Sequence, residues 1–234
     1  MRLSPAAAVF SAVLWSATIA HADPFILFNT FGPGDTFLLS GGHTVLADPT
    51  GLTPFRGGID TANAFQVSST SRFESVQLAL SWVPQSTFAP EGTQFVSVGQ
   101  TSDVLLLTDA GGTPGLVLES LHLDRVAGTP AVYTLTSHHR PVLFGGSRYW
   151  LGVSTGPEPT LIAWHSAEGL ISGLVGQRID EGPWRVVNLF GPNGVDAFRV
   201  FGVADATPVP EPSTLLLVFS ALLGLRHRWT ARRN

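Results

Sequence analysis

Ser154 stands in the segment Gly152-Val-Ser-Thr-Gly156, which matches the G-x-S-x-G pattern of serine hydrolases. In those enzymes the serine occupies a sharp turn from a strand into a helix, where a histidine activates it as a nucleophile. Pro157 and Pro159 follow at once, so the required helix cannot begin there. We interpret Ser154 as the end of a strand that enters a loop, and a secreted hydrolase stays an alternative.

Histidines are the residues that could hold a metal or act as a base. His138 and His139 are adjacent, and neighbouring residues of a strand point to opposite faces, so the two would not share a metal. His43, His122 and His165 could converge on zinc in the folded chain, but nothing in their spacing predicts it. We therefore expect exposed or hydrogen-bonded histidines, no metal site and no catalytic residue.

Three carboxylates, Asp103, Asp109 and Asp124, lie near the ends of predicted strands. Calcium in β proteins is often held by loop carboxylates and carbonyl oxygens, although no EF-hand pattern is present. Turn formation is the ordinary role of such aspartates. The sequence thus predicts no cofactor, with calcium left open.

Tryptophans could contact a sugar, because their ring faces stack on the apolar side of a pyranose. The alternating pattern around Trp82 places it on the apolar face of a strand, where it packs in the core. Trp164 and Trp184 lie beside polar or Gly-Pro segments and are the candidate glycan contacts, with core or rim packing as the alternative.

Composition excludes several kinds of chemistry. The chain has no Cys, which rules out disulfides, thiolate metal sites and cysteine nucleophiles. All 13 basic residues are Arg, and 16 of the 17 acidic residues lie between residues 23 and 210, which carry a formal charge of −8. Nucleic-acid affinity depends on clustered basic residues, so no nucleic-acid partner is expected.

The central region must position these residues, and its patterns are those of strands. In residues 75–82, Val76, Leu78, Leu80 and Trp82 alternate with small or polar residues, as in a half-buried strand. Residues 104–107 are continuously apolar and fit a strand buried on both faces. Further strands are expected over residues 25–28, 64–68, 116–123, 132–136, 148–153 and 161–165, and a final hairpin joins 184–190 to 197–203 through a turn containing Asn193-Gly194. This number of short strands predicts an all-β domain, a two-sheet sandwich of jelly-roll type.

The N-terminal end has the pattern of a secretory signal peptide. Arg2 precedes an apolar run over residues 6–20, and small residues stand at Ala20 and Ala22. The run is short for a bilayer span, which needs about 20 residues. We expect a signal helix over residues 1–22, cleaved by signal peptidase before Asp23.

The C-terminal end has a short motif, an apolar run and a basic stop, in that order. The motif is Val209-Pro210-Glu211-Pro212, and the apolar run covers residues 215–225. The basic stop consists of Arg226, Arg228, Arg232 and Arg233. Eleven residues form a helix of about 16 Å, and arginines favour the cytoplasmic side. We therefore expect residues 207–234 to form a tail that anchors the protein transiently in the inner membrane. Residues 23–206 are expected to form the domain that precedes it.

This three-part tail resembles the PEP-CTERM sorting signal of exopolysaccharide-producing Gram-negative bacteria, a motif also named the ice-binding protein C-terminal domain. The resemblance implies recognition by exosortase, an integral-membrane enzyme, and then release or re-attachment at the surface. The second name implies nothing about ice. Another Pro-Glu-Pro, at Pro157-Glu158-Pro159, has no apolar run or arginine cluster beside it and is expected to be a surface turn.

The central region resembles the choice-of-anchor R domain, a family of exported proteins with varied C-terminal anchors. The matching segments are residues 28–36, 75–80, 104–120, 149–151, 163–164, 182–184 and 197–200, in order along the mature chain. The resemblance implies a location and a β fold, not a reaction.

Together these features predict an exported, non-enzymatic protein of the cell surface or extracellular matrix. The expected partners are signal peptidase, exosortase and, transiently, the inner membrane, with exopolysaccharide as a further candidate. A carbohydrate-binding β-sandwich and a secreted hydrolase are the alternatives.

Overall fold

The computed structural model describes residues 23–51, 57–88, 93–169, 171–187 and 194–205, and within them every regular element is a β-strand. The prediction of an all-β domain is therefore confirmed. The first eight strands are β1 (Phe25–Asn29), β2 (Phe37–Ala47), β3 (Gly58–Gln66), β4 (Ser71–Trp82), β5 (Gln85–Phe88), β6 (Thr93–Val96), β7 (Ser102–Asp109) and β8 (Pro114–Leu123). The others are β9 (Ala131–Thr136), β10 (Val142–Leu143), β11 (Arg148–Thr155), β12 (Thr160–Ala167), β13 (Val175–Ile179), β14 (Arg185–Val186) and β15 (Phe198–Ala204).

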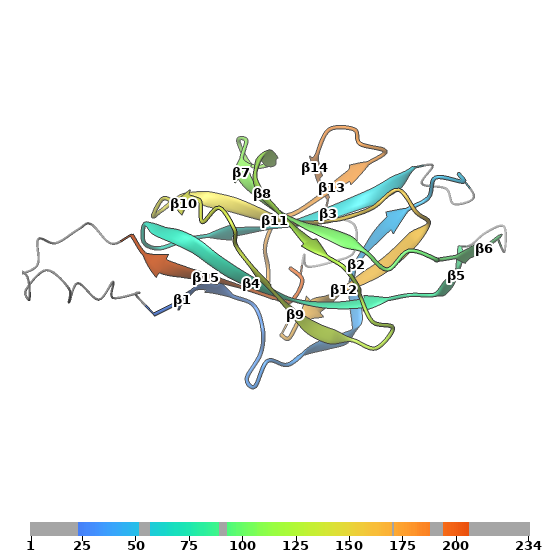
Figure 1. Ribbon diagram of the computed structural model, residues 1–234, viewed down its shortest axis with the longest axis horizontal. Coiled ribbons are helices and arrows are strands. Elements are labelled where there is room, and N and C mark those ends of the chain that lie inside the picture. Colours follow the sequence, from blue (N-terminus) through green and yellow to red (C-terminus); the bar gives the residue numbers. More distant parts are fainter. Residues whose placement is uncertain (1–22, 52–56, 89–92, 170, 188–193, 206–234) are drawn as a thin grey trace, which may run out of the picture. The chain divides into compact units, whose positions relative to one another are not determined.

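Hydrogen bonds join thirteen of these strands into one antiparallel sheet that curls on itself (Figure 1). Its main path runs β1-β15-β4-β12-β2-β3-β11-β7-β8. Strands β9 and β10 pair with β4, and β13 pairs with both β3 and β14. Strands β5 and β6 form a separate hairpin. The path has two parts, β1-β15-β4-β12-β2 and β3-β11-β7-β8. The pairing that joins them is short, since β2 and β3 pair only through Leu46–Ile59 and Ala47–Gly58.

Both parts of the curled sheet supply side chains to one apolar core. Val76, Leu78 and Leu80 of β4 are fully buried in it, and Trp82 packs against it, as the alternation of residues 75–82 predicts. From the other part come Leu106 and residues of β3 and β11. Burying apolar side chains in this way is the main source of stability for such a domain.

Some strands are buried on both faces because loops or short strands cover the outside of the sheet. Val104 and Leu106 of β7 face the main core, whereas Leu105 and Leu107 pack with Trp150 in a second cluster. The prediction that residues 104–107 are buried on both faces is confirmed. On the other part of the sheet, Phe31 packs over Ala79 and Ala197.

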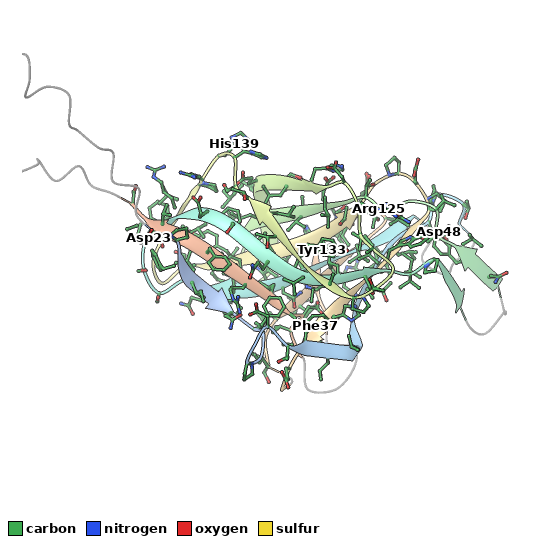
Figure 2. All side chains as sticks on the ribbon, turned by 60° about the horizontal axis from the view of Figure 1, so that its bottom comes forward. Asp23, Phe37, Asp48, Arg125, Tyr133 and His139 are labelled. Carbon is green, nitrogen blue, oxygen red and sulfur yellow. The ribbon has the colours of Figure 1, made fainter. Side chains whose placement is uncertain are left out.

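The first and last strands lie side by side, with Phe25 opposite Gly202. Ala204 in turn lies opposite Ser71, at the start of β4. Asp23, just before β1, therefore lies at one end of the sheet, and Asp48, just after β2, lies at the other (Figure 2).

Two local predictions differ from the structure. The final hairpin is wrong: β14 pairs with β13, and β15 pairs with β1 and β4, so the described part of residues 184–203 forms no hairpin of its own. The predicted turn residue Asn193 lies outside the described residues. The eleven-residue strand β2 is not predicted from the sequence, because Gly41-Gly42 interrupts its apolar pattern.

Candidate functional site

A pocket of about 370 Å³, with four charged residues in its lining, opens at the end of the sheet that carries Asp48. It lies where β2 ends, β3 begins and β11 and β13 end, so four strands contribute to its wall. Its lining residues are Leu46, Ala47, Pro49, Gly57, Gly58, Asp60, Ser154, Thr155, Gly156, Pro157, Arg178, Asp180 and Glu181. Pockets for small ligands commonly have volumes of about 300–1,000 Å³.

An ion pair between Asp60 and Arg178 forms part of the pocket wall. The two residues lie directly opposite each other in the antiparallel pairing of β3 with β13, which brings the side chains together on one face. Arg178 donates from Nε at 2.8 Å and from Nη2 at 2.5 Å, both to Oδ2 of Asp60. Oδ1 of Asp60 and Nη1 of Arg178 take no part in this pair. Both side chains are largely buried, at 14% and 27% exposure.

The indole ring of Trp184 contacts the arginine of this ion pair. The guanidinium of Arg178 lies 5.0 Å from the centroid of the indole ring, a cation–π distance. Trp184 also packs against the cluster of Ala62, Leu105, Leu107 and Trp150. Its ring is therefore engaged by the protein, and Trp184 is not among the pocket-lining residues. Trp184 is half-buried and adjacent to the pocket through Arg178, so the prediction that it contacts a glycan stays a prediction.

Two further carboxylates stand where β13 ends. Asp180 and Glu181 both have left-handed backbone conformations, with φ of 53° and 57°, and form a tight turn in which the amide of Gly182 donates to the carbonyl oxygen of Ile179. Oδ1 of Asp180 accepts a hydrogen bond from the amide of Gly58 at 3.1 Å. Gly57 lies so close to this carboxylate that an added Cβ would approach Asp180 Oδ1 to 2.5 Å. Both acidic side chains are exposed, so they form the outer wall of the pocket.

Trp164 is not a surface residue. It is fully buried, its Nε1 donates to the carbonyl oxygen of Ala197 at 3.2 Å, and its ring meets Phe198 edge-on. The prediction that Trp164 contacts a glycan is wrong, because its strand β12 lies within the sheet between β2 and β4.

Ser154 lines the pocket, but without the geometry of a hydrolase. It lies near the end of β11, and its carbonyl oxygen accepts a hydrogen bond from Ser102. The chain continues through a loop into β12, and residues 148–167, all of them described, contain no helix. The strand-to-helix turn of the G-x-S-x-G motif is therefore not formed at Ser154.

A second polar group, formed around Asp196, is buried inside the domain. Asp196 is fully buried and accepts hydrogen bonds from His43 Nδ1 at 3.0 Å and Asn63 Nδ2 at 2.8 Å, and from the amide of His43 at 3.2 Å. Burial raises the pKa of Asp196, and the bonds from His43 and Asn63 oppose this only in part. Burial lowers the pKa of His43, but the hydrogen bond and charge of Asp196 outweigh it, so that pKa is raised.

His165 lies close to this group but has a different environment. Its Nε2 is 2.9 Å from Ser81 Oγ, while its Nδ1 has no hydrogen-bond partner among the described residues. Burial lowers the pKa of His165. A serine, a histidine and an aspartate thus occur near one another, but Asp196 is bonded to His43 and not to His165. The arrangement ties strands together and does not form a charge-relay triad.

Two of the three predicted carboxylates flank His122, and the third lies elsewhere. His122 lies between Asp103 at 2.8 Å and Asp124 at 3.6 Å, on an exposed surface. Asp109 instead accepts hydrogen bonds from Trp150 Nε1 and from the amide of Gly112. Among the described residues, no three histidine, aspartate or glutamate side chains gather so that they could hold a metal.

The predicted processing sites lie outside the described residues. These are Ala20 and Ala22, the motif Val209, Pro210, Glu211 and Pro212, and the arginines Arg226, Arg228, Arg232 and Arg233. Within the part of the chain that is described, no helix is long and apolar enough to cross a membrane.

No sequence pattern predicts the Asp60–Arg178 pair or the group around Asp196. Asp60 and Arg178 are 118 residues apart, and His43 and Asp196 are 153 residues apart, so no local spacing connects them. Only the strand pairings bring each pair together.

No family model and no curated protein matches the chain. Among solved structures, the cysteine protease and lectin-like domains of a surface layer associated protein of Clostridium difficile are similar over 63% of this chain, with 15% identity and a TM-score of 0.41. The chain spans about a third, 32%, of that structure. Broad bean stain virus is similar over 70% of this chain and 97% of its own, with 11% identity and a TM-score of 0.25. These are distant resemblances, and neither assigns a family or a site to this chain.

Proposed function

We propose that the chain is an exported, non-enzymatic protein of the cell surface or extracellular matrix, sorted by an exosortase through its C-terminal Pro-Glu-Pro signal. The sequence of the two ends supports the proposal, since a signal peptide precedes the β domain and a motif, an apolar run and a basic stop follow it. We also propose that the β domain is a two-sheet sandwich of jelly-roll type.

The observation that carries the proposal is the pairing of Phe25 with Gly202. Cleavage before Asp23 leaves two residues ahead of β1, and the motif begins at Val209, shortly after β15 ends at Ala204. The first and last strands of the described domain therefore lie side by side.

Changing Pro210, Glu211 and Pro212 together to Ala tests the sorting step. We expect the variant to accumulate in the inner membrane of the native host, because the exosortase no longer recognises it. Intact mass spectrometry of the surface and medium fractions then detects no processed product, whereas the unaltered chain gives a mass that ends near residues 207–214.

The second Pro-Glu-Pro supplies a matched control. Glu158 is exposed in the loop before β12, so Glu158→Ala removes the same side chain from the same tripeptide in a different context. Glu158→Ala is expected to be released normally. Normal release of the triple variant, or a surface mass that runs through Asn234, means that the tail is an ordinary anchor.

The two alternatives concern the domain and not its export. A secreted hydrolase that acts through Ser154 would need a nucleophile elbow there, and residues 148–167 contain no helix that could form one. A carbohydrate-binding module would need an accessible polar site, and the pocket beside Arg178 is such a site.

A further inference from the structure

We propose that the pocket beside the Asp60–Arg178 pair binds a neutral sugar ring, through two neighbouring hydroxyl groups of a pyranose. This inference concerns a ligand and does not depend on how the chain is sorted. The proposed sugar contact is with the Asp60–Arg178 ion pair, which no sequence pattern predicts, and not with the face of a tryptophan.

The ion pair offers both functions that a pair of sugar hydroxyls needs. A hydroxyl group donates one hydrogen bond and accepts others. Oδ1 of Asp60 is a carboxylate acceptor outside the ion pair, and Nη1 of Arg178 is a guanidinium donor outside it. One hydroxyl can therefore donate to Asp60 while its neighbour accepts from Arg178. Hydrogen bonds to charged partners are stronger than those between neutral groups.

The pair is also held in place before any ligand arrives. Strand pairing fixes Asp60 opposite Arg178, and Trp184 lies against the guanidinium. Side chains that are already ordered lose little conformational entropy on binding. The wall also contains apolar residues, of which Ala47, Pro49 and Pro157 can contact the apolar side of a ring.

Charge favours a neutral ligand over an anion. The formal charges of Asp60 and Arg178 cancel, which leaves the inner wall without net charge. Asp180 and Glu181 add two negative charges at the outer wall, so a phosphate or a carboxylate would be repelled. A pocket of about 370 Å³ has room for one sugar unit and part of a second.

The test uses the full chain in a detergent that has no sugar headgroup, titrated with the methyl glycosides of glucose, galactose and mannose. Binding is followed by isothermal calorimetry and by saturation-transfer NMR. We expect at least one methyl glycoside to bind, with a dissociation constant of about 1 mM or below. Inorganic phosphate, the anionic probe, is expected not to bind.

The decisive variant is the double change Asp60→Asn and Arg178→Met. Removing either charge alone would leave its partner unpaired and partly buried, which destabilises proteins, whereas removing both leaves no unpaired charge. The unbranched side chain that Arg178→Met introduces would still cover Trp184. Sugar binding is expected to weaken by about tenfold or more, since a charged hydrogen-bonding group is lost on each side.

One further variant makes the result specific. Asp35→Asn removes a carboxylate that is also paired with an arginine, Arg199, but outside the pocket, and should leave binding within about twofold of the parent.

Two results would overturn the proposal: no methyl glycoside binds, or the folded double variant binds as well as the parent. Thermal melting of each variant establishes that it is folded. If the double variant does not fold, Ser154→Phe, which fills the pocket and keeps the ion pair, must abolish binding or the proposal is wrong. None of these results affects the sorting proposal.

Discussion

Asp196 shows how a single buried charge organises residues that are distant in sequence. Its carboxylate joins His43 of β2 and Asn63 of β3 to the segment that leads into β15. It is fully buried, and charges in such positions are tolerated only where hydrogen bonds and an opposite charge compensate for the lost water. We infer that this group stabilises the join between the two parts of the sheet.

The His43–Asp196 pair predicts how stability depends on pH. Because the pKa of His43 is raised in the folded chain, its contribution is fully present below the unfolded value, about 6.5, and is lost as the pH rises through the folded value. His43→Gln is therefore expected to lower the free energy of unfolding more at pH 5.5 than at pH 8. Urea unfolding at both pH values measures it.

His138→Gln is the control for that measurement, since His138 is exposed and lies on the connection after β9. It should unfold like the parent at both pH values. His165 must be kept in every variant, because burial lowers its pKa and its contribution runs the opposite way, being lost as the pH falls. An equal loss at both pH values for His43→Gln would show that His43 is not charged in its pair with Asp196.

At the scale of elements, β2 is shaped by two glycines. Gly41 and Gly42 both have φ of 99°, and the register between β2 and β12 shifts between Trp164 and Ser166, opposite this point. Such a bulge re-aims the following side chain, which here is His43. An added Cβ at Gly42 would lie 2.0 Å from the carbonyl oxygen of Trp164, so only glycine fits.

Gly42→Ala is therefore expected to destabilise the domain by about 3 kcal/mol or more, through both the strained φ and the clash. Gly111→Ala is the matched control, because Gly111 has φ of 74° but nothing within 4 Å of an added Cβ. The control should lose only about 1 kcal/mol, the cost of the backbone conformation alone. Equal thermal shifts for the two variants would mean that the contact with Trp164 is relieved by movement of β12.

The elements that sequence reasoning predicts well are those with a local signal. The alternation over residues 75–82 and the apolar run over residues 104–107 reflect burial, and burial is what the structure shows there. The failures are non-local. Residues 197–203 do form a strand, but its partners are β1 and β4, and no property of the nearby sequence distinguishes them from β14.

The contrast between local signals and non-local pairings also holds for the candidate site. A motif singles out Ser154, which does lie in the pocket wall, whereas Asp60 and Arg178 carry no motif and are not predicted. The prediction for Trp164 fails because polar neighbours in sequence, such as His165 and Ser166, suggest exposure. In the fold these neighbours are themselves buried, at 4% and 8% exposure, beneath the segment that contains Phe37.

At the scale of the whole molecule, the described residues form a complete curled sheet around one main core. Among these residues, the members of the main core lie between residues 27 and 200, and β1 and β15 complete one edge of the sheet. A chain of residues 23–205 is therefore expected to fold by itself.

The melting temperature of a chain of residues 23–205 should lie within a few degrees of that of the processed protein recovered from the native host. Circular dichroism and an amide NMR spectrum check this. A spectrum with the narrow dispersion of an unfolded chain would show that the tail or the signal segment is needed for folding.

The position of β15 also gives the domain a preferred direction of mechanical strength. This strand has neighbours on both sides, β1 and β4, and its last residue leads directly to the tail. Interstrand hydrogen bonds of antiparallel strands run perpendicular to the strand axis. In the proposed anchored and ligand-bound form, a force that pulls on Ala204 along β15 while the pocket end is held loads these bonds together in shear and does not peel them apart one at a time. The domain is therefore expected to resist force best along the direction of β15.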